Sequence, residues 1–150
     1  MKDMEEKLVN FKRKLGAVAD FLESRGLKFM VVGSGALLTC GIPIPREVGD
    51  IDLEVCCNGK EADVFKVLQD ATFPQNSQYQ SLKSDKPYIF TYRGVKVNVW
   101  AVEEFSHKQC VEKDGILYAT AYSVLKKKMA YRRPKDLEDL THIVKTLLEI

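Results

Sequence analysis

The sequence has no long hydrophobic run and no excess of charge of one sign. Its 150 residues carry 23 Lys and Arg against 21 Asp and Glu, so net charge alone does not indicate a nucleic-acid partner. The apolar stretches are far shorter than the ~20 residues that a transmembrane helix needs. The N-terminus is charged and lacks the apolar core of a signal peptide. We therefore expect a cytoplasmic protein that makes no membrane contact.

The sequence also lacks a CxxC pair, although it contains four cysteines. The adjacent Cys56 and Cys57 lie on a predicted strand, where neighbouring residues cannot readily bond to each other. This usage is typical of reduced, mostly buried thiols. A chain of this length can bury roughly two-thirds of its unfolded surface without disulfides. We expect a single domain over residues 1–150.

The periodicity of apolar residues predicts an α/β domain with a mixed central β-sheet flanked by helices. Helices are expected at Lys2–Arg25, in a short segment at Ala36–Cys40, at Lys60–Ala71 and Ala121–Arg132, and from Pro134 onward. Strands are expected at Phe29–Gly33 and Asp50–Val55, followed by a hairpin of Tyr88–Tyr92 and Val95–Val102. We expect the first two strands to be neighbours.

Two carboxylates two residues apart on a strand are the most informative feature. Asp50 and Asp52 share one face because strand side chains alternate. Neighbouring carboxylates repel each other, and a hard cation such as Mg²⁺ relieves the repulsion. Asp50 and Asp52 are therefore candidate metal ligands.

Gly33 and Ser34 follow the first strand directly. Glycine lets the backbone approach a phosphate, and the N–H groups at a following helix start are donors for it. The alternative is a tight turn that simply needs glycine. The downstream acids favour phosphate binding. Arg46, in the connecting loop, either contacts a phosphate or pairs with Glu47 or Asp50.

A basic cluster precedes the last predicted helix. No acidic residue occurs between Gly115 and Lys135, where the basic residues are Lys126, Lys127, Lys128, Arg132, Arg133 and Lys135. Clustering of one sign indicates an anion-facing patch, with a solvated helix face as the alternative.

Three motifs together resemble the nucleotidyltransferase superfamily that includes DNA polymerase beta. A strand ending in Gly33-Ser34 precedes Asp50-x-Asp52, with fifteen residues between Ser34 and Asp50. Arg46-Glu47-Val48-Gly49-Asp50-Ile51-Asp52-Leu53 is similar to the Arg-x-Thr-x-Asp-Ile-Asp-Leu run of AbiEii-type proteins, with Val48 in place of Thr. Lys128, followed by Asp136 and Asp139, resembles the lysine-and-aspartate motif of the same group.

The resemblance implies a nucleotidyltransferase fold and Mg²⁺-dependent transfer of a nucleotidyl group from an NTP to a hydroxyl of RNA or protein. It implies that Asp50 and Asp52 bind the metal and act in catalysis with Asp136. It also implies that Lys128 contacts the nucleotide triphosphate. Gly33, Ser34 and Arg46 are the other candidate nucleotide-binding residues. A toxin-like role with a cognate antitoxin protein as partner follows from the same resemblance.

The chain departs from the superfamily at the third carboxylate, for which it has Asn98 in Val97-Asn98-Val99. If Asn98 takes the third ligand position that the resemblance implies, its side chain should lie on the face of Asp50 and Asp52, on a neighbouring strand. The alternation of Val95, Val97 and Val99 supports this orientation of an uncharged third metal ligand. The alternative to an active enzyme is a catalytically degenerate module that binds nucleotide, RNA or a partner protein.

Overall fold

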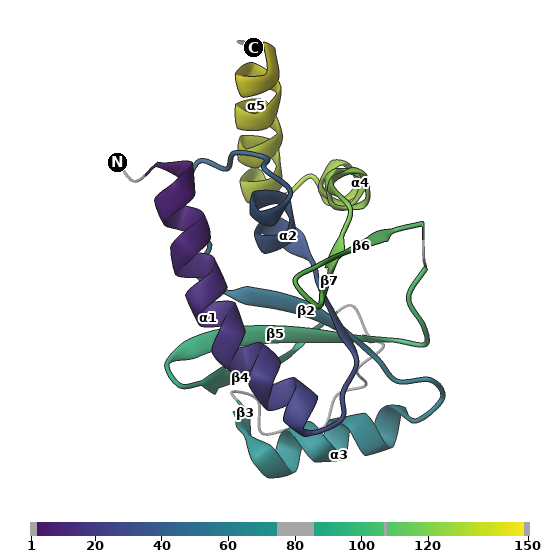
Figure 1. Cartoon of the computed structure of the whole chain (residues 1–150). Helices are drawn as coiled ribbons and strands as arrows, with labels where there is room; N and C mark the ends of the chain where they lie inside the picture. Colours follow the sequence, from purple (N-terminus) through teal and green to yellow (C-terminus); the bar gives the residue numbers. More distant parts are fainter. Residues whose placement is uncertain (1–2, 75–85, 107, 149–150) are drawn as a thin grey trace.

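The computed structural model describes residues 3–74, 86–106 and 108–148 (Figure 1). The described helices are α1 (Met4–Ser24), α2 (Gly33–Thr39), α3 (Glu61–Ala71), α4 (Ala121–Tyr131) and α5 (Pro134–Leu148). The described strands are β1 (Phe29–Val31), β2 (Ile51–Cys56), β3 (Phe73–Pro74), β4 (Tyr88–Tyr92), β5 (Val95–Val102), β6 (Cys110–Lys113) and β7 (Ile116–Ala119). The predicted α/β class is confirmed.

The strands form one mixed sheet in the order β3-β4-β5-β2-β1-β7-β6. The central strand β2 is antiparallel to β1 and parallel to β5, and β1 is parallel to β7. The predicted neighbours Phe29–Gly33 and Asp50–Val55 do pair, and the predicted hairpin is the β4–β5 pair. This order places the Gly33 end of β1 beside the start of β2.

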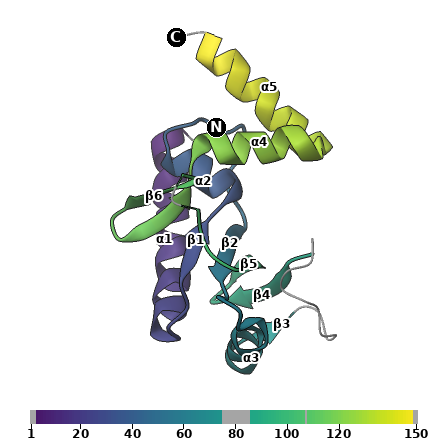
Figure 2. The ribbon, with the colours of Figure 1, turned by 90° about the vertical axis from the view of Figure 1, so that its right-hand side faces the viewer.

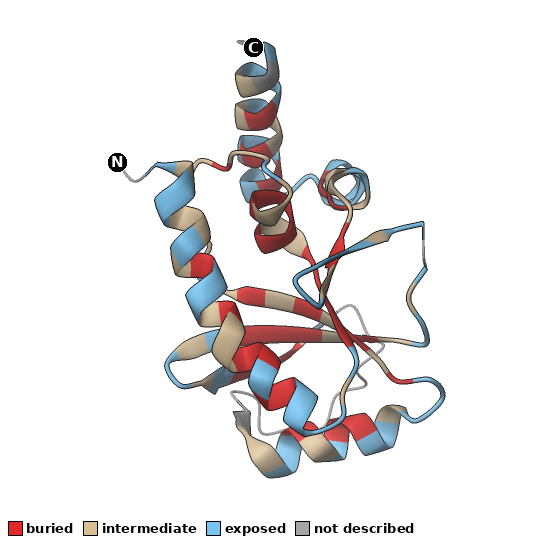
Figure 3. Ribbon diagram, in the orientation of Figure 1, coloured by how far each residue is buried: buried red, intermediate tan, exposed pale blue. Residues whose placement is uncertain are grey.

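The two faces of β2 differ in burial as the alternation predicts. Ile51, Leu53 and Val55 are fully buried, whereas Asp52 and Glu54 on the other face are half-buried. Figure 3 shows the buried residues gathered along β1, β2 and β5 and on the inner sides of the helices. One face of β2 therefore packs in the core, and its acidic face remains accessible to other side chains and to solvent.

Helix α1 lies across the core face of the sheet and supports α2 (Figure 1). The Asp3 side chain caps its first turn by accepting from Glu6 N. Phe11 reaches α2 where Gly35 stands, and a Cβ on Gly35 would lie 2.3 Å from the Phe11 ring. Because only glycine fits there, α2 can pack tightly and its first residue is held at the end of β1.

Helices α4 and α5 lie at one end of the sheet, joined by a sharp turn, and α4 packs against α2 (Figure 2). We call this pair of helices the α4–α5 unit. Thr120 caps α4 by accepting from Ser123 N, and Arg132 ends it in the left-handed conformation, with φ of 53°. Pro134 then begins α5, where its fixed φ suits the first turn. In Figures 1 and 2 the C-terminal end of α5 extends past the other elements.

All four cysteines are free, but only Cys57 is buried. The expectation of mostly buried thiols is therefore wrong, because Cys40, Cys56 and Cys110 lie at the ends of elements. In the described ranges no helix is long and apolar enough to cross a bilayer.

Candidate active site

The acidic pair and Asn98 form one hydrogen-bonded cluster on neighbouring strands. Asp52 and Asn98 are direct partners across the β2–β5 pair. The amide nitrogen Nδ2 of Asn98 donates to Asp52 Oδ1 at 2.8 Å and to Asp50 Oδ2 at 3.3 Å. Lys96 Nζ lies 3.6 Å from Asp50 Oδ2 at the exposed side of the cluster. The predicted orientation of Asn98 is thus observed, with its amide N–H donors pointing between two carboxylates.

Gly33 lies directly against this cluster. Its φ is +68°, and a Cβ built on it would lie 2.8 Å from Asp52 Oδ2. The neighbouring Val32 N donates to Asp52 O at 2.9 Å, which fixes the end of β1 against β2. Ser34, in the first turn of α2, is half-buried. Both the conformation and the space at Gly33 therefore require glycine.

The pKa of Asp52 is raised above its ordinary value. Burial is the largest cause, and the charge of Asp50 adds to it. The Asn98 hydrogen bond and the positive charges of Lys135 and Lys128 act in the opposite direction without cancelling it. The surroundings of Asp52 therefore disfavour its charge, and a bound cation would offset this effect.

A second group of ionic residues lies inside the α4–α5 unit. The side chains of Asp136 and Asp139 are completely buried, and Lys128 is only 6% exposed. Lys128 Nζ donates to Asp139 Oδ2 at 2.8 Å and lies 3.6 Å from Asp136 Oδ1. Arg46 forms a bidentate salt bridge with the same Asp139 carboxylate. Asp139 thus ties the loop before β2 to both helices.

Asp136 holds the turn between α4 and α5. Its carboxylate accepts from Arg133 Nε at 2.7 Å, from Nη2 at 3.2 Å and from the Arg133 backbone N at 3.2 Å. Burial raises the pKa of Asp136. The hydrogen bonds and charge of Arg133, together with the charge of Lys128, lower this pKa by more than burial raises it, so the net shift is downward. Asp136 is therefore ionised, fully enclosed and a weak base in this arrangement.

The six residues of the basic cluster differ in their partners. Lys128 and Arg133 pair with the buried acids, and Lys127 Nζ contacts Glu54 Oε2 on the acidic face of β2 at 2.8 Å. Lys126, Arg132 and Lys135 are exposed. Half of the residues that the sequence indicated as an anion-facing patch therefore form ion pairs within the chain.

The structure brings the sequence-predicted residues into two groups that interact electrostatically. The first group consists of Gly33, Asp50, Asp52 and Asn98, and the second, the buried ionic group, contains Arg46, Lys128 and Asp136. The charge of Lys128 lowers the pKa of Asp52, and the charge of Asp52 raises the pKa of Arg133. Reasoning from sequence missed Asp139 as the shared partner of Arg46 and Lys128. The available signal was spacing, since Asp136, Asp139 and Ile143 fall on one helical face.

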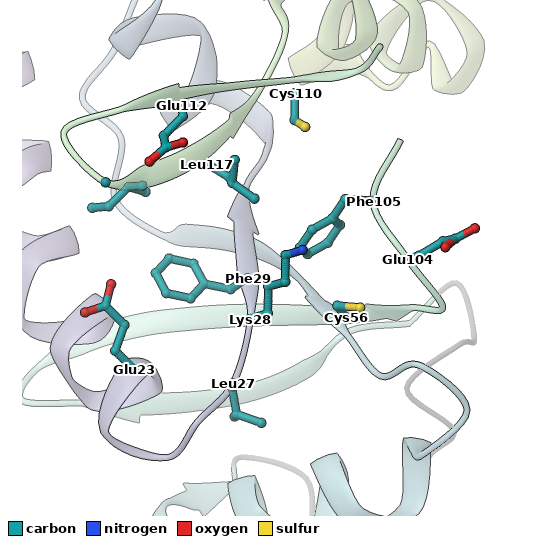
Figure 4. A pocket seen from close by; sticks show the side chains of 12 residues that line it. Glu23, Leu27, Lys28, Phe29, Cys56, Glu104, Phe105, Cys110, Glu112 and Leu117 are labelled. Atoms are coloured by element: carbon teal, nitrogen blue, oxygen red, sulfur yellow. The ribbon is translucent and has the colours of Figure 1, made fainter. Parts of the chain in front are cut away.

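A cavity of about 610 Å³ lies at the other end of β1 (Figure 4). Lys28, Phe105, Cys56, Cys110 and Leu117 are among its lining residues. Lys28 Nζ stands over the Phe105 ring at 5.8 Å from its centroid. The cavity shares no lining residue with the acidic cluster. In the described part of the chain, no group of three or more His, Cys, Asp and Glu side chains is arranged to hold a metal.

No protein-family model matches the chain, and no curated protein sequence matches it at a significant level. Solved structures do match. The antibiotic-resistance factor ANT(2'')-Ia has a TM-score of 0.60 and 12% identity over 90% of this chain and 83% of its own. TM1012 of Thermotoga maritima, a proposed nucleotidyltransferase, has a TM-score of 0.56 and 19% identity over 94% of both chains. At these identities the likeness establishes architecture, and the chain has the nucleotidyltransferase fold.

Proposed function

We propose that this protein is a nucleotidyltransferase that uses Mg²⁺ to transfer a nucleotidyl group from an NTP to a hydroxyl. The observation that carries the proposal is the contact of Gly33 with Asp52, beside the cluster of Asp50, Asp52 and Asn98. A backbone position without a side chain next to two carboxylates suits a phosphate chain and a hard cation. The fold, shared with ANT(2'')-Ia and TM1012, supports the same activity.

The donor set fits Mg²⁺. Asp50 and Asp52 offer carboxylate oxygens, and Asn98 offers a carbonyl oxygen if its amide turns over. The Asn98 N–H group already occupies the position between the carboxylates that a cation would favour. When bound, the metal would neutralise phosphate charge and take its remaining ligands from the nucleotide.

The residues of the chain would divide the other tasks by position. Gly33 and Ser34 would receive the triphosphate at the end of β1. Lys128 of α4 and Arg46 of the loop before β2 would supply positive charge, since Asp139 holds both. Nucleotidyl transfer depends mainly on positioning and on charge stabilisation at phosphorus, which this arrangement provides.

Asp136 enters the proposal as the residue that keeps Arg133 and Lys128 in place. The direct catalytic role that the resemblance implies would require the acceptor hydroxyl to reach a carboxylate that is enclosed here. A lowered pKa suits orientation of a hydroxyl better than removal of its proton.

The acceptor in this proposal is a hydroxyl of RNA or protein, in line with the AbiEii-type resemblance. A related chemistry is visible in a structural neighbour, since ANT(2'')-Ia was solved in complex with adenylyl-2''-tobramycin, at 12% identity and a TM-score of 0.60 over 89% of this chain and 87% of its own. A toxin-like role in the cytoplasm with a cognate antitoxin protein as partner belongs to the same proposal.

A second candidate function is nucleotide, RNA or partner binding without catalysis. The observation in its favour is Asn98, whose N–H donors already compensate Asp50 and Asp52. An asparagine adds no negative charge to the site, so metal binding is weaker than with three carboxylates.

Label transfer distinguishes the two candidates. The protein is incubated with Mg²⁺, each α-labelled NTP in turn, and total RNA or total protein as acceptor. An active enzyme incorporates label, loses incorporation in Asp52→Asn and keeps it in the control Asp70→Asn, an exposed acid on α3. Absence of incorporation with every NTP and both acceptors contradicts the enzyme.

A further inference from the structure

The exposed large apolar side chains of the described residues gather at the C-terminal end of the chain. Six of eight lie on α4 and α5: Tyr122, Met129, Tyr131, Leu137, Val144 and Leu148. On α5 the exposed fractions are 49% for Leu137, 55% for Val144 and 82% for Leu148. Apolar side chains gathered on a protruding element are typical of an interaction surface.

These residues form a continuous stripe along α5. At 3.6 residues per turn, Leu137, Thr141, Val144 and Leu148 fall within an arc of about 60°. Asp136, Asp139 and Ile143, by contrast, point into the protein and are buried. Helix α5 therefore has one face packed against its own chain and an apolar stripe, the α5 stripe, that faces outward on the part of the molecule that extends furthest (Figures 1 and 3).

We propose that the α5 stripe binds the α5 stripe of a second copy of this chain, with the two helices antiparallel. The charges that flank the stripe fit this partner. Glu138 lies near the start of the helix and Lys145 two turns later, and both are exposed on the same side of the stripe. In an antiparallel pair, residues on the same side of the two stripes meet, so each Glu138 faces a Lys145 of the second copy.

The spacing is self-complementary in register as well. When the helix is reversed so that Leu137 faces Leu148 of the second copy, Thr141 faces Val144. In that register Glu138 and Lys145 of the two copies are offset by two residues, which is about 3 Å along the axis. Glutamate and lysine side chains span that offset. The apolar and the charged contacts are therefore satisfied by one and the same two-fold arrangement.

A parallel arrangement does not use these charges. It brings opposite sides of the two stripes together, so Glu138 and Lys145, which lie on one side, would not meet. The antiparallel pair also leaves the acidic cluster clear, because the stripe lies on the side of α5 opposite Asp136 and Asp139. The dimer is thus independent of whether the proposed transferase activity is present.

Sedimentation equilibrium of the full chain over a wide range of protein concentration tests the proposal. We expect a monomer–dimer equilibrium that Val144→Glu shifts fully to monomer. Val9→Glu is the matched control, because Val9 on α1 is exposed to a similar extent, 60% against 55% for Val144. Circular dichroism verifies that each variant is folded. A wild-type monomer throughout, or a dimer that resists Val144→Glu, overturns the proposal.

Charge reversal tests the antiparallel register. Glu138→Lys and Lys145→Glu should each raise the dimer dissociation constant by about tenfold, because each turns two attractive contacts into repulsive ones. Mixing the two variants restores opposite charges at both contacts and should give a heterodimer about as tight as wild type. Single reversals without effect, or a mixture that fails to associate, contradict this register.

Discussion

Gly33 and Asp52 are packed so closely that a methyl group on the first would lie 2.8 Å from a carboxylate oxygen of the second. This contact joins the end of β1 to the acidic face of β2. In the proposed function it is also the place where the backbone would approach a phosphate. The relationship is therefore a packing constraint, and the proposed nucleotide site is built on it.

Gly33→Ala should destabilise the protein by about 2–4 kcal/mol, as the sum of a left-handed backbone penalty and a steric conflict with Asp52. Gly94→Ala is the matched control, since Gly94 has φ of +80° but nothing within 4 Å of its added Cβ. Urea denaturation of both variants measures the difference. Equal losses in the two would show that the contact with Asp52 carries no cost.

Asp139→Ala should cost about 3–5 kcal/mol, because it leaves Lys128 and Arg46 as buried or half-buried cations without their shared partner. Lys127→Ala, which removes the exposed pair with Glu54, should cost no more than about 1 kcal/mol. Chemical denaturation gives both values. A loss below 1 kcal/mol for Asp139→Ala would mean that the buried ionic group does not hold α5 in place.

The pH dependence of stability should contain two opposite contributions. The pKa of Asp52 is raised, mainly by burial, so its ionisation costs free energy that is absent below the unfolded pKa of about 3.9 and develops as pH rises through the folded value. Asp52→Asn removes this cost. The variant should gain stability over wild type progressively above about pH 4 in the absence of metal.

Asp136 and Asp139 contribute to the pH dependence of stability with the opposite sign to Asp52. Burial raises the pKa of each, but Arg133 and Lys128 around Asp136, and Arg46 and Lys128 around Asp139, lower it more. Their stabilisation is present above the unfolded pKa and is lost as pH falls through the lowered folded values. Thermal melts from pH 7 to pH 2 should therefore show a loss of stability below about pH 4 in wild type and in Asp52→Asn alike. A stability difference between the two proteins that does not change with pH would contradict the assigned shift of Asp52.

Asn98→Asp should make stability depend on Mg²⁺. Without metal, the variant loses two N–H donors and gains a third negative charge, so its melting temperature should fall by several degrees. With millimolar Mg²⁺ it should recover more than wild type does, and transferase activity should rise. Melting curves with and without Mg²⁺ measure the effect. An equal response of both proteins to Mg²⁺ would remove Asn98 from the metal site.

The fold was largely predictable because its signals are local. The alternation in β2, the Arg93-Gly94 turn and Pro134 at the start of α5 each depend on a few adjacent residues. The acidic cluster was predictable only in part from such signals, since alternation gives the face of its own strand on which Asn98 lies. Its place beside Asp50 and Asp52 came from the resemblance to the superfamily, because it depends on the pairing of β2 with β5.

The ion pairs of the buried ionic group could not be predicted from local sequence patterns. Arg46 and Asp139 are 93 residues apart, and the local candidates for Arg46 were Glu47 and Asp50. Lys127 and Lys128 look identical in sequence, yet one pairs at the surface and the other is buried. Which of two adjacent lysines turns inward depends on the packing of α4 against α5, which no local pattern states.

Isothermal titration calorimetry with Mg²⁺ and each ribonucleoside triphosphate measures whether nucleotide binding depends on the metal. We predict saturable binding of at least one NTP that requires Mg²⁺, is lost in Asp52→Asn and is retained in Asp70→Asn. Absence of binding by every NTP, or binding that persists without Mg²⁺ and in Asp52→Asn, would contradict a metal–nucleotide site at Asp50, Asp52 and Gly33.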